Sequence, residues 1–203
     1  MSSRRFVFLP LAAAGALAFA AATASAHPDA LTSGPSASRC GGSLWQLRSL
    51  ADSGRGRVNM NARVSSVAAL AALQAPGRSP SSRDAFERQA YQVTAQVVKF
   101  RADSAGLHLV LFKDDAYMLA TLPSAGCLPS YARARAVMVA TRRWFDKNCG
   151  VPSSSWKNLG AVVRVTGVGY WGSKSAPSAA PNGAQLAPVF GMNPVAGCGA
   201  GGG

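Results

Sequence analysis

The sequence predicts an α+β protein, mainly β, in which three strands precede one amphipathic helix and two strands follow it. Three observations predict this order. Apolar residues alternate from Tyr91 onward, a helical period follows Cys127, and β-favouring residues return at Ala161. The 203 residues suffice for one folded domain with a buried core and tails.

The first two predicted strands form a hairpin. Residues 91–100 alternate between apolar and polar, and the apolar side changes face at Val98, which predicts a bulge in a long strand. Residues 101–106 contain Asp, Ser and Gly and predict the hairpin loop. Residues 107–112 are almost wholly apolar and predict the second strand.

The third strand and the helix come next. Residues 113–115, Lys-Asp-Asp, predict a turn, and a strand over 117–122 is expected to end at Pro123, which has no amide hydrogen for a ladder. After Cys127 the apolar period lengthens. One arc of a helix would hold Tyr131, Ala134, Met138, Thr141 and Phe145.

Two strands complete the domain. Residues 161–170 are rich in valine, and glycines 167 and 169 among them predict a bend. A Pro-Asn-Gly turn at 181–183 then precedes a strand over 185–190. The resulting order, β-β-β-α-β-β, matches the OB-fold, a five-stranded barrel that binds oligonucleotides or oligosaccharides across one face and two loops. Other five-stranded barrels and open α+β sheets are the alternatives.

The start of the chain predicts export. A cationic stretch at 2–5, an apolar stretch to about Ala22 and the small-x-small site Ala24-Ser25-Ala26 form a cleavable signal peptide. An uncleaved anchor and a twin-arginine signal are the alternatives. The predicted organisation is a signal peptide (1–26), a flexible mature start (27–43), a short helical extension with a linker (44–82), an OB-like barrel domain (83–192) and a glycine-rich tail (193–203).

The composition is strongly basic. The chain has 21 Lys and Arg against 8 Asp and Glu, a net charge of +13. Cleavage at Ala26 would remove Arg4 and Arg5 and leave 19 against 8, or +11. Such a charge attracts nucleic acid, phosphorylated glycolipid, acidic glycan or an anionic membrane surface. Because the charges are scattered, a role in solubility alone is the alternative.

All four cysteines follow the predicted cleavage site, so they would meet an oxidising compartment, the periplasm or the outside of the cell. Two disulfides are therefore expected. No C-x-x-C pair occurs and the histidines are limited to His27 and His108, so we expect no metal and no cofactor.

Several short motifs occur in a fixed order along the mature chain. They are Cys40-Gly41 followed by Trp45, Val67-Ala68-Ala69-Leu70 leading to Ala75-Pro76, Tyr91-Gln92-Val93-Thr94-Ala95, His108-Leu109-Val110-Leu111, Leu122-Pro123-Ser124 with Cys127, Val165-Thr166-Gly167-Val168-Gly169, and Ala180-Pro181-Asn182-Gly183. In this order the chain resembles an uncharacterised family of small exported bacterial proteins with a nuclease-like or OB-type barrel. The family has no established activity, so the resemblance implies no catalytic residues.

The resemblance also bears on the cysteines and on the polar residues. It implies that Cys40 pairs with Cys127, and it suggests a second bridge between Cys149 and Cys198, which are additions to the family pattern. Gln185 stands where relatives have an acidic residue. Most of the polar groups that would support chemistry are therefore missing.

Two sets of residues are candidates for a binding site. His108 lies in a predicted strand, where a structural histidine is the alternative to a general base because the sequence assigns it no partner. Tyr170, Trp171 and Lys174 precede and enter the loop over 172–181. Together they would stack on a base or sugar and contact a phosphate, with core packing of the two rings as the alternative.

The sequence therefore favours a non-catalytic, exported, OB-like binding module whose basic surface engages an anionic polymer or an envelope partner. In an OB-fold its binding loops would be 101–106 and 172–181. A nuclease-like hydrolase and an envelope assembly factor without a small ligand are the alternatives. The acidic residues are dispersed, and the one adjacent pair, Asp114 and Asp115, predicts a turn.

Overall fold

The structure is a computed structural model that describes residues 36–77 and 82–199. The predicted signal peptide, part of the flexible start and most of the linker lie outside these residues. In the part of the chain that is described, no helix is long and apolar enough to cross a membrane.

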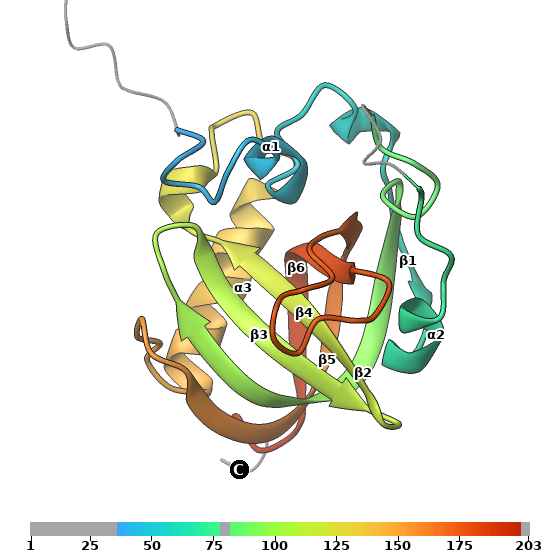
Figure 1. Cartoon of the computed structure of the whole chain (residues 1–203). Helices are drawn as coiled ribbons and strands as arrows, with labels where there is room; N and C mark the ends of the chain where they lie inside the picture. Colours follow the sequence, from blue (N-terminus) through green and yellow to red (C-terminus); the bar gives the residue numbers. More distant parts are fainter. Residues whose placement is uncertain (1–35, 78–81, 200–203) are drawn as a thin grey trace, which may run out of the picture. The chain divides into compact units, whose positions relative to one another are not determined.

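Six strands form one sheet, which closes on itself (Figure 1). Their order is β1-β2-β3-β4-β6-β5, and β5 also pairs with β2, so the last five strands form a closed ring. The pairs within the ring are antiparallel except for β4 with β6, which is parallel. The strands are β1 (Asn59–Val64), β2 (Gln89–Ala102), β3 (Gly106–Lys113), β4 (Ala116–Pro123), β5 (Lys157–Trp171) and β6 (Ala184–Ala196).

The five ring strands follow the predicted order, with helix α3 (Arg135–Asn148) between the third and the fourth. The predicted count of five strands omits β1, which pairs in parallel with the start of β2 outside the ring. Its residues, Asn-Met-Asn-Ala-Arg-Val, alternate between polar and apolar, but the strand is short, lies at an edge of the sheet and buries none of its residues.

Several predicted details of the strands are confirmed. The register of β2 shifts between Val97 and Lys99 against both of its neighbours, which is the bulge expected at Val98. β4 ends at Pro123. The pairing of β5 with β6 is irregular at Gly167 and Gly169, where a Cβ on Gly169 would lie 2.5 Å from the carbonyl oxygen of Phe86. Gly169 therefore allows the segment before β2 to pass close to β5, and Gly167 allows β6 to do so.

The core lies inside the ring. Each strand turns alternate apolar side chains inward, as Leu107, Leu109 and Leu111 do on β3, and all three are fully buried. Full burial of a leucine side chain contributes roughly 1.5–3 kcal/mol, so these rows supply much of the driving force for closure. Phe145 of α3 also joins this cluster and meets Phe100 edge to face at 5.2 Å.

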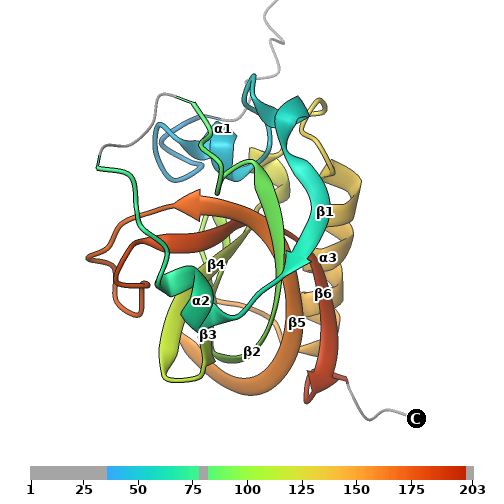
Figure 2. The same ribbon diagram turned by 90° about the vertical axis from the view of Figure 1, so that its right-hand side faces the viewer.

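Helix α3 packs on β6 through the side chains expected from its period (Figure 2). Met138, Thr141 and Phe145 are buried, and the Thr141 hydroxyl donates to the carbonyl of Phe190 at 3.1 Å. The helix begins at Arg135, so the prediction that Tyr131 belongs to its buried arc is wrong. Tyr131 precedes the helix and is exposed.

The predicted helical extension forms short elements before the ring. They are α1 (Trp45–Arg48), the 3-10 turn η1 (Arg55–Arg57) and α2 (Val67–Ala71). The hydroxyl of Ser66 caps α2 by accepting the N–H of Ala69. Asn182 donates to the carbonyls of Leu70 and Leu73 at the other end. The predicted turn at 181–183 is thereby tied to α2.

Both expected disulfides form. Cys40 bonds Cys127 in the 3-10 turn η2 (Ala125–Cys127), and Cys149, directly after α3, bonds Cys198 near the end of the chain. The first is the pairing that the family resemblance implied, and the second is the bridge suggested by the joint presence of the two additional cysteines. The first joins residues 87 positions apart, and the loss of chain entropy in the unfolded state stabilises the fold by about 4.6 kcal/mol.

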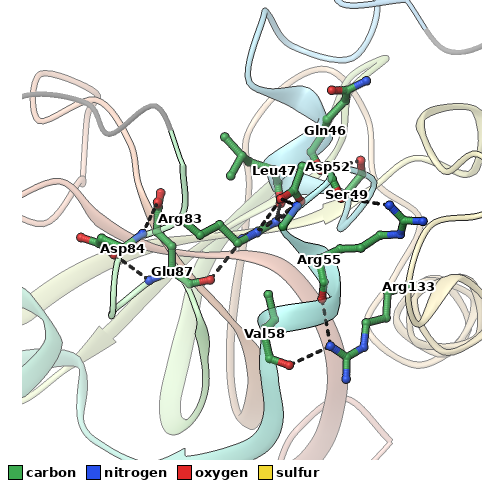
Figure 3. A network of polar contacts seen from close by, with 11 residues as sticks. Gln46, Leu47, Ser49, Asp52, Arg55, Val58, Arg83, Asp84, Glu87 and Arg133 are labelled. Carbon is green, nitrogen blue, oxygen red and sulfur yellow. Dashed lines mark hydrogen bonds and ion pairs between the residues drawn. The ribbon is translucent and has the colours of Figure 1, made fainter.

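A buried arginine joins the extension to the start of β2 (Figure 3). The guanidinium of Arg83 donates to the Asp52 carboxylate, at 2.7 Å from Nη2 to Oδ1, and to the carbonyl oxygens of Leu47 and Glu87. The side chain of Arg83 is 1% exposed and that of Asp52 is 15% exposed. The charge of each is therefore balanced largely by the other.

Replacing Arg83 with methionine leaves the Asp52 carboxylate and two carbonyl groups without their donor. Loss of one partner of a buried pair destabilises a protein by about 3–5 kcal/mol, so we expect urea unfolding of Arg83→Met at a correspondingly lower concentration. Arg142→Met is the control, since its pair with Asp146 is half exposed and contributes at most about 1 kcal/mol. Equal losses in the two variants would contradict this account.

Candidate functional site

A pocket of about 480 Å³ lies on the outer surface of the ring. Every ring strand contributes to its floor. The floor residues are Arg101 of β2, His108 of β3, Leu119 and Thr121 of β4, Tyr170 of β5 and Gln185 of β6. Because neighbours on a strand face opposite sides, the buried rows beside these residues place them on the outer face.

The register of the sheet brings these residues together. Arg101 pairs with His108 across β2 and β3, His108 pairs with Thr121 across β3 and β4, and Tyr170 pairs with Gln185 across β5 and β6. Directly opposed residues on paired strands have Cβ atoms about 4.5–5.5 Å apart. Between β4 and β6, Gln185 pairs with Leu119, two residues before Thr121. The polar residues therefore form two short rows that meet at β4.

Two walls rise from this floor. One comes from the segment around α1, through Gly41 and Arg48. The other is the loop between β5 and β6, orange-red in Figure 1, through Gly172, Ser173, Ala176 and Pro177. Trp156, just before β5, completes the lining. The expected binding loop over 172–181 thus borders the pocket, while Arg101 is the sole lining residue from the expected loop over 101–106.

Arg48 is held in place by the backbone. Its Nη2 donates to the carbonyl oxygen of Cys40 at 3.0 Å and also to that of Gly41. The guanidinium carbon lies 5.9 Å from the centre of the Tyr170 ring, within the range of a cation–π contact. Burial raises the pKa of Tyr170, the nearby charge of Arg48 lowers it and that of Glu87 raises it, so the hydroxyl stays protonated at neutral pH.

Arg101 is positioned by an aromatic ring and a carboxylate. Its guanidinium carbon lies 5.1 Å from the centre of the Trp156 ring, and Nη2 lies 3.7 Å from Oδ2 of Asp103. Planar guanidinium groups stack on aromatic faces and keep their edges for hydrogen bonds. Arg101 can therefore present N–H groups to a ligand while it stays on Trp156.

His108 has two polar neighbours. Its Nε2 lies 3.0 Å from Oδ1 of Asp103, an ion-pair distance without the geometry of a hydrogen bond, and Nδ1 is 3.4 Å from the hydroxyl of Thr121. Burial alone would raise the pKa of Asp103. Contact with His108 and the N–H groups of Ala105 and Gly106 outweighs burial and lowers the pKa below its ordinary value.

Three nitrogen atoms of the lining are buried and make no hydrogen bond with any described residue. They are Nε of Arg48, Nε of Arg101 and Nε2 of His108. No other buried side-chain nitrogen or oxygen in the described part of the chain is left this way. All three belong to side chains that line the pocket, so the polar groups of this pocket are less fully paired than those in the rest of the described chain.

The structure brings together two of the four predicted binding residues. His108 and Tyr170 line the pocket, whereas Trp171 and Lys174 do not. The indole N–H of Trp171 donates to Oδ2 of Asp84 at 2.7 Å and its ring packs 4.5 Å from Phe86, so its role is structural. Lys174 is exposed in the loop.

Sequence reasoning missed Arg48 and Trp156, and it included Arg101 only as part of the expected loop over 101–106. No local motif marks Arg48 or Trp156, because both reach the pocket through distant segments. Asp103 and His108 could have been found together, since they flank a hairpin turn and come close once β2 and β3 pair. The adjacent acids Asp114 and Asp115 occupy the β3–β4 turn with positive φ values of 51° and 58°, as predicted.

The described residues contain no group of three or more His, Cys, Asp or Glu side chains that could hold a metal ion.

Comparison with known proteins does not assign the chain to a family. No family model and no curated protein matches the chain, so the resemblance to an exported bacterial family stays a prediction.

Among solved structures, the chain is similar to a putative aspartyl-tRNA synthetase from Leishmania major Friedlin, with a TM-score of 0.42 and 11% identity. The match covers 69% of this chain and 22% of that chain. At this level of similarity, nothing known of that protein carries over.

The lowered pKa of Asp103 predicts an acid-sensitive contribution to stability. The folded state holds the Asp103 proton less tightly than the unfolded state, so the carboxylate stabilises the fold above pH 3.8, and this stabilisation is lost as the pH falls below 3.8 through the folded value. Asp103→Asn should therefore lower the free energy of unfolding at pH 6. Its difference from the unmodified protein should shrink toward pH 2 in urea titrations.

The double variant with His108→Leu provides the control. Because contact with His108 lowers the pKa, the effect of Asp103→Asn should be smaller in that background. A difference that does not change with pH would contradict the assignment.

Proposed function

We propose that this protein is a non-catalytic binding module of the OB type that engages an anionic polymer through the pocket between α1 and the β5–β6 loop. Three features of the ring support an OB-type barrel. The helix lies between its third and fourth strands, its third and fifth strands are parallel, and its first strand pairs with its fourth. OB-folds bind ligands on their outer strands, between the loops after the first and fourth strands.

One observation carries the proposal: the side chains of Arg48 and Arg101 line a single pocket. A guanidinium group matches the geometry of carboxylate and phosphate through two parallel hydrogen bonds. The two arginines come from segments that are far apart in sequence. Their convergence therefore distinguishes this pocket from the scattered basic surface.

The acidic residues support binding over hydrolysis. Asp114 and Asp115, on which a nuclease-like site would depend, are exposed in the β3–β4 turn and do not line the pocket. A metal-dependent nuclease needs carboxylates that face one ion. The polar lining is instead composed of groups that bind and orient, chiefly Arg, Gln, Thr and Ser.

We further propose that the protein works beyond the cytoplasmic membrane, in the periplasm or outside the cell. Its two disulfides support this location, since such bonds persist in oxidising compartments. Acidic glycans and phosphorylated glycolipids are anionic polymers or surfaces in such places. Free nucleic acid, which is also negatively charged, is a further candidate ligand for the pocket.

Binding of the purified protein to polygalacturonate, to a DNA oligonucleotide and to vesicles that contain a phosphorylated glycolipid tests the proposal. We expect binding to at least one of them, weakened by salt. Arg48→Gln with Arg101→Gln should weaken it tenfold or more, because a hydrogen bond to a charged group contributes about 1.5–3 kcal/mol.

Arg143→Gln with Lys147→Gln is the matched control. Both side chains are exposed on α3 and neither lines the pocket, so this pair removes the same charge elsewhere. Thermal unfolding will show whether the loss of Arg48 disturbs the fold. If it does, the affinity of the single variant Arg101→Gln replaces that of the double variant in the comparison. Equal loss in the two double variants, or no binding to any of the three ligands at low salt, would contradict the proposal.

A further inference from the structure

The charge of the pocket suits one anionic group. Arg48 and Arg101 line it, while the carboxylate of Asp103 lies 3.7 Å from Nη2 of Arg101 and 3.0 Å from Nε2 of His108. No Asp or Glu belongs to the lining itself. Two guanidinium charges beside one carboxylate leave an excess of one positive charge, which one carboxylate or phosphate group of a ligand would balance.

The aromatic rings of the pocket are poorly placed to stack bases. Tyr170 is 7% exposed and lies under the guanidinium of Arg48. Trp156 has Arg101 on one face and is 45% exposed. Proteins that bind single-stranded nucleic acid offer free aromatic faces to successive bases. Here only Trp156 is exposed, so the pocket offers no row of rings for successive bases.

The neutral part of the lining is rich in groups that pair with hydroxyls. The hydroxyls of Thr121 and Ser173 and the amide of Gln185 lie there, and each of them can both donate and accept. The amide of Gln185 has its place because residue 172 is glycine. A Cβ at that position would overlap the Gln185 amide nitrogen.

We propose that the pocket binds one sugar unit of an acidic glycan, with its single carboxylate or phosphate between Arg48 and Arg101 and its hydroxyls on Thr121, Ser173 and Gln185. This inference rests on the proposed binding function and specifies its ligand. The volume of about 480 Å³ lies within the range of about 300–1,000 Å³ typical of small-ligand pockets.

Isothermal titration calorimetry with four small ligands tests the inference. Digalacturonic acid carries carboxylates, glucose 6-phosphate carries a phosphate, maltose is neutral, and a thymidine dinucleotide with a 5′-phosphate represents nucleic acid. We expect at least one anionic sugar to bind tenfold or more tightly than both maltose and the dinucleotide. The two anionic sugars show which group the arginines prefer.

Gly172→Ala examines the contacts to hydroxyls. The added methyl group displaces the Gln185 amide, so the favoured anionic sugar should bind about threefold to tenfold more weakly. Gln185→Leu should give the same loss if Gly172→Ala fails to fold. Gly56→Ala is the control, since a Cβ there meets no atom within 4 Å.

The outcomes separate the two proposals. Tighter binding of the dinucleotide, or binding of polyanions with no binding of either anionic sugar, would overturn the sugar inference and leave the binding function standing. Unchanged affinity in both Gly172→Ala and Gln185→Leu would also overturn it. If neither the small ligands nor the polyanions bind, both the sugar inference and the proposed binding function would be overturned.

Discussion

The placement of the pocket depends on the buried guanidinium of Arg83. It holds the carbonyl of Leu47, directly before Arg48, and the carbonyl of Glu87, just before β2. The Glu87 carboxylate in turn accepts the N–H of Trp171 at the end of β5, where the second wall of the pocket begins. A buried ion pair adds little net stability, since desolvation offsets attraction. Its main effect here is to position both walls against the same strands.

The same network buries the carboxyl group of Glu87, and hydrogen bonds offset part of the free-energy cost of that burial. Glu87 is 3% exposed, and burial is the main reason why its pKa is raised, with the N–H groups of Trp171 and Asp84 opposing that shift. On the opposite side of the pocket, the Cys40–Cys127 disulfide fixes the chain beside Gly41 without any buried charge. The wall that carries Arg48 is thus anchored covalently at one end and through Arg83 at the other.

Local patterns predicted the ring and only part of the site. Alternation located β2 and its bulge at Val98, because burial on one face of a strand imposes that period, while apolar or valine-rich runs next to turn residues located the other ring strands. β1 was not predicted: its six residues also alternate, but Asn59 and Asn61 are typical of turns and none of the six is buried. Trp171 looked like a ligand contact beside Lys174, yet its indole bonds Asp84, 87 positions away. Arg48 meets the floor of the pocket only through tertiary contacts, which no local pattern encodes.

The difference between Lys174 and the two arginines explains why a scattered basic charge is a poor guide to a binding site. An exposed lysine must lose rotamer freedom to hold an anion, which costs up to about 2 kcal/mol. Arg48 is already fixed by two carbonyls and the Tyr170 ring, and Arg101 by the Trp156 ring. Side chains that are ordered before binding lose little entropy when a ligand arrives. Preorganised cations beside a nearly balanced charge therefore favour one well-placed anionic group, whereas the remaining basic surface attracts any polyanion.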